Sequence, residues 1–139
     1  MFIRRAIFLC FTALATYFSA STPALAQANA EEVVENICGN VSRASEELAR
    51  GYTEGNVTQQ KWEAWQKDND SRIAGLVELG FDEESAQIQI YFYDLYGKYF
   101  WQGSPKWLPA VEKYGAETMI TTYEQTTYKQ CLEELKRLL

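Results

Sequence analysis

Residues 82–101 read DEESAQIQIYFYDLYGKYFW, and this stretch decides the fold class. Its centre, Gln87 to Tyr91, alternates polar and apolar residues as a strand does, and aromatic residues also favour strands. The length favours a helix instead, because strands are usually shorter than about 10 residues. Wound as a helix, the stretch places Gln87, Asp94 and Lys98 on one narrow polar strip, with Asp94 and Lys98 as an i,i+4 pair. Almost every other side chain is apolar, which predicts the central helix of a bundle, in contact with several neighbours.

An amphipathic helix of about 20 residues is predicted near the start of the folded chain. Asn29 and Glu32 form a capping-box pattern, so we expect the helix to begin at Asn29. Gly51 and Gly55 are expected to end it. Its apolar stripe consists of Val34, Ile37, Val41, Ala44, Leu48 and Tyr52.

A second helix is predicted before residue 80. Asn56 or Thr58 can cap its N-terminus, and Gly80 is expected to end it, with Phe81 placed for the apolar contact of a Schellman motif. The polar stretch 66–72 interrupts the apolar pattern, which indicates either a face in solvent or a kink.

The last third of the chain is predicted to hold a short irregular segment and a final helix. Residues 103–105 are Gly, Ser and Pro, and Pro109 follows too soon for an uninterrupted helix, so short turns are expected up to Gly115. The final helix is expected from about Ala116 to Arg137. Its apolar face comprises Ile120, Thr127, Cys131, Leu135 and Leu138. The predicted fold class is all-α, a small bundle of about four main helices.

Residues 1–26 have the pattern of a cleaved signal peptide. A short basic start precedes an apolar run that is too short to span a bilayer, and residues 24–26 form an A-x-A cleavage site. Cleavage after Ala28 or Ala30 and an uncleaved anchor are the alternatives. No later segment is apolar for long enough to span a bilayer, so no stable membrane insertion is expected. The mature chain, residues 27–139, is expected to be a single domain in the periplasm or secreted from the cell.

Two cysteines remain after removal of the signal, Cys38 in the first predicted helix and Cys131 in the last. Thiols of an exported chain are oxidised, so we expect one disulfide that ties the two terminal helices together. A redox-active pair and two free thiols are the alternatives. Such pairs usually have a C-x-x-C arrangement, whereas these cysteines lie 93 positions apart.

The charge balance disfavours some classes of partner. Without Arg4 and Arg5 the mature chain keeps 11 of the 13 Lys and Arg residues against 19 Asp and Glu residues, so its formal charge falls from −6 to −8. Nucleic acid and anionic lipid surfaces are disfavoured because both attract cationic proteins. A basic protein partner is favoured by electrostatic steering. The chain contains no histidine, which removes imidazole bases and imidazole zinc ligands.

Aromatic residues are densest between Tyr91 and Trp107. One interpretation is core packing, since a central helix needs large side chains on most sides. The other is a binding surface around the loop expected at residues 103–105, because binding residues collect on loops. The candidate binding residues are Lys98, Tyr99, Trp101, Lys106 and Trp107.

Three further residues have both a structural and a functional interpretation. Trp62 and Trp65 lie three positions apart and share a helix face, either as packing residues or as a docking surface. Glu124 falls within the apolar stripe of the final helix. A carboxylate there either reaches the rim or, if buried, has the raised pKa of a general acid.

Common templates for enzyme chemistry do not fit this sequence. Without histidine there is no Ser-His-Asp triad, and no Gly-rich phosphate loop is present. Residues 68–70 read DND, as a calcium loop begins, but an EF-hand needs Gly and Glu where this chain has Ile73 and Leu79. Paired carboxylates can hydrolyse glycosides, but nothing in the sequence singles out a pair. We therefore expect no enzyme activity, no catalytic residue, no metal and no cofactor.

These observations together favour a non-enzymatic binding protein of the cell envelope. In general architecture, a small exported helical protein with one bridge between its terminal helices resembles the periplasmic immunity proteins, which block toxins. It resembles the acid-stress chaperones more loosely. The alternatives to an immunity- or inhibitor-type protein are therefore an acid-stress periplasmic chaperone and a carboxylate-dependent hydrolase of cell-wall glycans.

Overall fold

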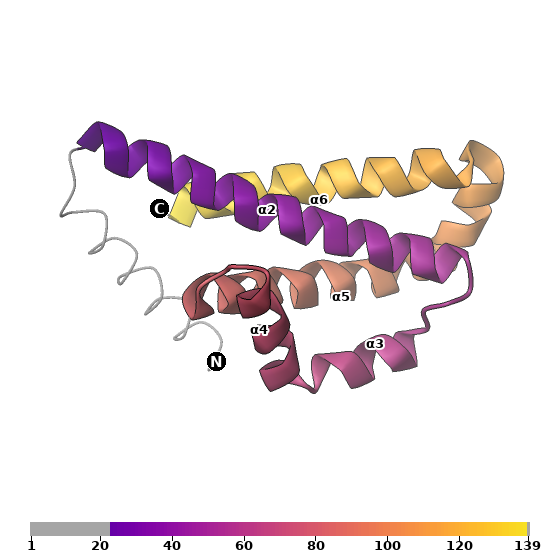
Figure 1. Cartoon of the computed structure of the whole chain (residues 1–139). Helices are drawn as coiled ribbons and strands as arrows, with labels where there is room; N and C mark the ends of the chain where they lie inside the picture. The colour runs from indigo at the N-terminus through magenta and orange to yellow at the C-terminus, as the bar shows by residue number, and fades with distance from the viewer. Residues whose placement is uncertain (1–22, 139) are drawn as a thin grey trace.

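The computed structural model describes residues 23–138, with side chains from residue 29 onward. The described residues form five helices and no strand: α2 (Pro23–Thr53), α3 (Gln59–Gln66), α4 (Asn69–Glu78), α5 (Glu83–Tyr114) and α6 (Ala116–Leu138). Figure 1 shows α2 and α6 running side by side in opposite directions, with α5 beneath them and α3 and α4 along the lower side of the molecule. The predicted all-α fold class is confirmed.

The first helix, α2, begins earlier than its capping pattern predicts. Asn29 lies inside α2, so the predicted N-cap there is wrong. The alternating alanines of residues 24–30 have high helix propensity, which lets the helix start before Asn29. After α2 ends, Gly55 takes a φ of 78°, and the Asn56 N–H donates to the Gly51 carbonyl at 2.8 Å. The predicted signal peptide lies outside the described residues, except that its last four residues form the first turn of α2.

The predicted second helix is two helices, α3 and α4, separated at Lys67 and Asp68. Of the two expected caps, Asn56 and Thr58, it is Thr58 that caps α3. Its side chain accepts a hydrogen bond from the backbone N–H of Lys61 at 3.2 Å. Asp68 caps α4 in the same way, through a backbone N–H three residues on. The Asp68 side chain bonds to a backbone N–H group and so starts a new helix at this point. The kink interpretation of residues 66–72 is therefore confirmed.

The turn between α4 and α5 follows its sequence signals. Gly80 has a φ of 100°, and the Phe81 N–H donates to the Leu76 carbonyl at 3.2 Å, as in the predicted Schellman motif. Asp82 then caps α5 by accepting a bond from the Ser85 N–H at 2.7 Å. The start of the central helix is therefore where the sequence places it.

Helix α5 continues through Pro105 and Pro109, so the predicted irregular segment is wrong. Pro105 lacks the N–H that would donate to the carbonyl of Trp101. The Ser104 hydroxyl donates to that carbonyl instead, at 2.9 Å. Both prolines are exposed, so water can reach the carbonyl that Pro109 leaves without a helical donor.

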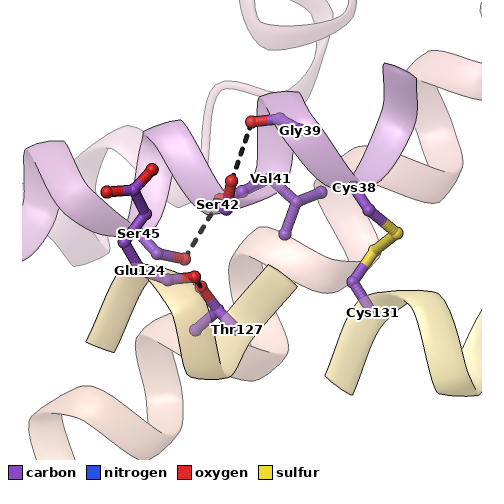
Figure 2. The surroundings of a disulfide bond; sticks show 8 residues. All are labelled: Cys38, Gly39, Val41, Ser42, Ser45, Glu124, Thr127 and Cys131. Atoms are coloured by element: carbon purple, nitrogen blue, oxygen red, sulfur yellow. Dashed lines mark hydrogen bonds between the residues drawn. A yellow bond between two sulfur atoms is a disulfide. The ribbon is translucent and has the colours of Figure 1, made fainter. Parts of the chain in front are cut away.

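The predicted disulfide joins Cys38 of α2 to Cys131 of α6, with their Cα atoms 5.5 Å apart. Figure 2 shows the bridge between the two helices, and both cysteines are fully buried. One core cluster gathers around it, with Ile37 and Val41 from α2 and Phe92 and Tyr96 from α5. The bridge thus crosses the core and does not lie on the surface.

Helix α6 buries most of its predicted apolar face. Its buried residues are Ile120, Thr127, Cys131 and Leu135. Leu138 is 44% exposed, contrary to the prediction, because a residue in the last turn has neighbours on fewer sides. Glu124 is half-buried, and its carbonyl accepts a bond from the Thr127 hydroxyl at 2.9 Å.

The expectation that α5 is the central helix is confirmed by its contacts with α2, α4 and α6. A second core cluster lies along its C-terminal half and includes Phe100, Trp101 and Trp107, packed against Ala49 and Ile120. Core packing therefore accounts for these aromatic residues of α5.

Burial of three tyrosine side chains predicts a loss of stability at alkaline pH. Burial raises the pKa of Tyr93 to about 12, and it also raises the pKa values of Tyr96 and Tyr123. In the unfolded chain, tyrosine loses its proton near pH 10. The folded state binds more protons between about pH 10 and 12, so stability that is present below pH 10 is lost as the pH rises through this range. Tyrosinate absorbance should show these groups ionising only as circular dichroism reports unfolding, and ionisation of all tyrosines near pH 10 in a folded chain would contradict this.

Candidate functional site

Trp101 and Trp107, two of the five predicted binding residues, lie in the core. They are only 7% and 8% exposed, and the ring centroid of Trp107 lies 5.2 Å from that of Phe100. The Trp107 Nε1–H donates to the Thr53 hydroxyl at 2.8 Å. The prediction that this segment is a surface loop is wrong, because α5 continues through both prolines and turns both indole rings inward.

Lys98, Tyr99 and Lys106 are exposed on α5, and 55% of Tyr99 is accessible to solvent. The structure does not join the five predicted residues in one surface, since these three face solvent while the two indole rings face the core. A binding role for the three exposed residues stays a prediction.

A cleft of about 650 Å³ lies between α2 and the α3–α4 pair, with residues of α5 at its back. We call it the lateral cleft, and Figure 1 shows the helices that enclose it. Its volume is in the range of ligand-binding sites. Its large apolar lining residues are Leu48, Val57, Trp62, Trp65, Leu76 and Leu79. Its polar lining residues are Asn40, Arg43, Ser45, Glu47, Lys61, Ser71, Arg72 and Tyr93.

Two large apolar side chains of the lateral cleft are exposed to solvent. Trp65 of α3 is 45% exposed, and Leu79, the C-cap residue directly after α4, is 69% exposed. Single exposed apolar residues are ordinary on a protein surface. Two that line the same concave surface are typical of a binding site.

Trp62 anchors α3 to the rest of the protein. No residue of α3 is buried, but the Trp62 ring lies so close to Gly97 of α5 that a Cβ there would overlap it. The centroid of this ring is 6.4 Å from that of Trp101. Trp65 has its ring centroid 6.2 Å from that of Tyr93 and stays exposed. The packing interpretation therefore holds for Trp62, whereas a docking role for the exposed Trp65 stays a prediction.

Arg72 connects α4 to α5 beside the lateral cleft. Its side chain is 1% exposed, and its Nη2 lies 2.6 Å from Oδ1 of Asp94. Its Nη1 donates to the Gln66 carbonyl at 3.2 Å, and the guanidinium carbon lies 4.1 Å from the centre of the Trp65 ring. Asp94 thus pairs with Arg72, so the predicted pair of Asp94 with Lys98 is wrong. The reason is that Asp94 faces α4, which the spacing within one helix does not reveal.

A polar cluster of Asn40, Gln89 and Tyr93 connects α2 to α5. The Asn40 amide Nδ2 donates to Oε1 of Gln89 at 2.6 Å and to the Tyr93 hydroxyl at 2.8 Å. The Tyr93 hydroxyl donates to Oε1 of Gln89 at 3.2 Å. Gln89 is fully buried, while Asn40 and Tyr93 line the lateral cleft. Gln89 therefore holds these two cleft residues in place from behind.

A second hollow of about 500 Å³ includes two acidic residues, Glu35 and Asp82, among its lining residues. Asp82 already serves as the N-cap of α5, so helix capping accounts for its position. Within residues 23–138, no group of three or more His, Cys, Asp or Glu side chains is placed to hold a metal ion. No helix in that range is both long and apolar enough to cross a membrane.

The sequence does not single out Asn40, Arg43, Arg72 or Gln89 as site residues. Gln89 carries a usable signal, because it lies opposite the polar strip of its helix, where a polar side chain needs a buried partner. Arg72 also carries a signal, because it lies four positions before the apolar Leu76 and so shares its helix face. Asn40 and Arg43 lie beside the apolar stripe of α2, where polar residues are ordinary.

Comparison of the chain with known protein families, with curated proteins and with solved structures found no match. A function for this protein has to be inferred from its fold and its lateral cleft.

Proposed function

We propose that this protein is an exported, non-enzymatic binding protein that holds a segment of a partner protein in the lateral cleft. The observation that carries the proposal is a cleft of about 650 Å³ with Trp65 and Leu79 exposed along it. Covering apolar side chains that are exposed to water at a concave surface is favourable, so these residues would contribute to the affinity for a partner. An immunity- or inhibitor-type protein would use such a cleft to engage its target.

Export is proposed from the signal-peptide pattern of residues 1–26. The disulfide between Cys38 and Cys131 supports it, because disulfides persist in oxidising compartments. Mass spectrometry of the protein from the producing cell tests this proposal. A new N-terminus at Gln27 is expected, and an intact Met1 in a cytoplasmic fraction would contradict it.

Photo-crosslinking in the producing cell tests whether the lateral cleft meets a partner. A benzophenone amino acid at Leu79, which lines the cleft, is expected to capture one protein. The same group at Leu108 is the matched control, because Leu108 is 47% exposed on α5 and does not line the cleft. Equal capture from both positions would show that the cleft is not the contact surface.

Gly75→Phe is expected to block the lateral cleft while the protein stays folded. Gly75 lines the cleft, and a Cβ there would meet no atom within 4 Å, so a side chain can start from this position without a clash. Replacing a glycine inside a helix also gains helix propensity. Calorimetry with the captured partner should show binding weakened about tenfold or more, a loss of about 1.4 kcal/mol or more. The melting temperature should not fall.

Gly103→Phe is the matched control for this variant. Gly103 is also helical and has equally open surroundings, but it lies on α5 and does not line the lateral cleft. It should bind the partner as the wild type does. Full binding by Gly75→Phe, or an equal loss in both variants, would place the partner elsewhere.

A further inference from the structure

The charges along the lateral cleft have the opposite sign to those of the whole chain. The formal net charge of the chain is −6, yet the charged residues that line the cleft are three cations, Arg43, Lys61 and Arg72, and one anion, Glu47. Net charge acts on a partner at long range. A bound segment responds mainly to charges within one Debye length, about 8 to 10 Å at physiological ionic strength.

Two of these cations are available to a ligand. Arg72 is neutralised by Asp94, whereas no ion pair of the described residues includes Arg43 or Lys61. Both are exposed, with Arg43 on α2 and Lys61 on α3. The pKa of the Tyr93 hydroxyl is raised by burial and by the charge of Glu47, while Arg72 and Arg43 act in the opposite direction, so the charges of Glu47 and Arg43 both lie within electrostatic range of the cleft interior. The cleft therefore has a cation on each of two sides.

The dimensions of the lateral cleft suit a short extended segment. Its lining residues on α2 run from Asn40 to Leu48, a rise of about 12 Å along the helix axis. This rise equals the length of three or four residues of extended chain. The apolar lining, with Trp62, Trp65 and Leu76, can cover one or two large side chains of such a segment.

The polar groups of the cleft favour a peptide over an alkyl chain. The amide of Asn40 and the hydroxyl of Tyr93 both line it and stand among its apolar residues. A peptide backbone carries donors and acceptors for such groups along its whole length. The N–H groups of Asn40 and the O–H of Tyr93 already donate within the polar cluster, so their oxygen atoms are what a ligand can still satisfy. An alkyl chain would cover these acceptors without offering a donor, which costs free energy.

We infer that the lateral cleft takes an extended peptide segment of its partner in which a carboxylate side chain neighbours a large apolar side chain. The apolar side chain lies against the two tryptophans, Trp62 and Trp65, and the carboxylate lies between Arg43 and Lys61. This inference rests on the proposed function and names the chemistry of the segment that the cleft holds.

Three capped hexapeptides test the inference by calorimetry on the full chain. The first is acetyl-Gly-Glu-Leu-Phe-Glu-Gly-amide, and the other two carry Gln or Lys in place of both Glu residues. The Glu peptide should bind about tenfold more tightly than the Lys peptide, with the Gln peptide between them, because two charge pairs are made or lost. Tryptophan fluorescence should change on binding, since Trp62 and Trp65 line the cleft.

Charge variants assign the preference to individual residues. Arg43→Gln and Lys61→Gln should each weaken the Glu peptide about threefold and leave the Gln peptide unchanged. The double variant Arg43→Glu with Lys61→Glu should reverse the order, so that the Lys peptide binds more tightly than the Glu peptide. Lys129→Gln, on the exposed side of α6, is the control and should change nothing.

The outcomes separate this inference from the proposed function. If all three peptides bind equally and Gly75→Phe abolishes binding, the cleft is a binding site and the carboxylate preference is wrong. If none of the peptides binds, but dodecanoate binds and depends on Arg43 and Lys61, the occupant is an alkyl carboxylate and the peptide is excluded. If neither the peptides nor dodecanoate binds, the inference is overturned, and the proposed function is then judged by the Leu79 crosslink alone.

Discussion

Replacing Cys38 and Cys131 together by alanine is expected to lower the free energy of unfolding by about 4 to 5 kcal/mol. The bridge joins residues 93 positions apart, and closing a loop of that length removes this much chain entropy from the unfolded state. Small domains have a net stability of only about 5 to 15 kcal/mol. The variant should therefore be marginally stable at best, which urea denaturation of both proteins measures.

Reduction of the wild-type protein measures the same bridge without removing a side chain. Both cysteines are fully buried, so a reductant should act slowly on the folded protein and rapidly in denaturant. Alkylation followed by peptide mapping should find neither Cys38 nor Cys131 free before reduction. A free thiol at either position, or a decrease of less than about 1 kcal/mol in the free energy of unfolding, would show that the bridge does not stabilise the fold as expected.

Trp107→Ala is expected to cost about 3 to 5 kcal/mol of stability, because it empties a volume in the core. The ring packs against Phe100 and Tyr123, with centroids 5.2 and 5.9 Å away, and its Nε1–H donates to Thr53. In a domain of this size the loss corresponds to a fall of more than about 10 °C in melting temperature. A thermal melt followed by circular dichroism provides the measurement.

Leu108→Ala provides the control at the next position of the same helix. Leu108 is 47% exposed, and alanine is at least as good a helix former, so stability should change by no more than about 0.5 kcal/mol. If Trp107→Ala kept the melting temperature of the wild type but lost partner capture, Trp107 would be a binding residue and not a core residue. This result would also show that the second core cluster is not where the stability of α5 resides.

Local signals in the sequence predict the helix ends well. Thr58, Gly80 and Asp82 act where the sequence places them, because a cap makes its hydrogen bonds within a few residues along the chain. The same signals mislead at Asn29, where the helix has already begun upstream. They also mislead at Pro105, where the Ser104 hydroxyl supplies the donor that proline lacks.

The candidate site depends on contacts between residues distant in the sequence. Arg72 and Asp94 meet across 22 positions, and Asn40 and Gln89 meet across 49. Neither pair has a periodic or spacing signal, because periodicity reports which face of one helix is buried and not which residue of another helix lies opposite. Of these four residues, Gln89 is the clearest anomaly in the sequence, as a polar residue on the apolar side of its helix.

The sequence by itself determined the all-α class, the central helix and the disulfide. Apolar periodicity, capping residues and the count of cysteines are each properties of the chain alone. Only the tertiary structure decided that Trp101 and Trp107 are core residues and that the lateral cleft exists. The inward turn of the two indole rings follows from the continuation of α5 through its prolines. The cleft follows from the placement of α3, which is held on α5 by the packing of Trp62 on Gly97 and by the hydrogen bond from Gln66 to Asp94. Both depend on how whole helices pack against one another, and that packing is set by the fit of side chains from several helices at once.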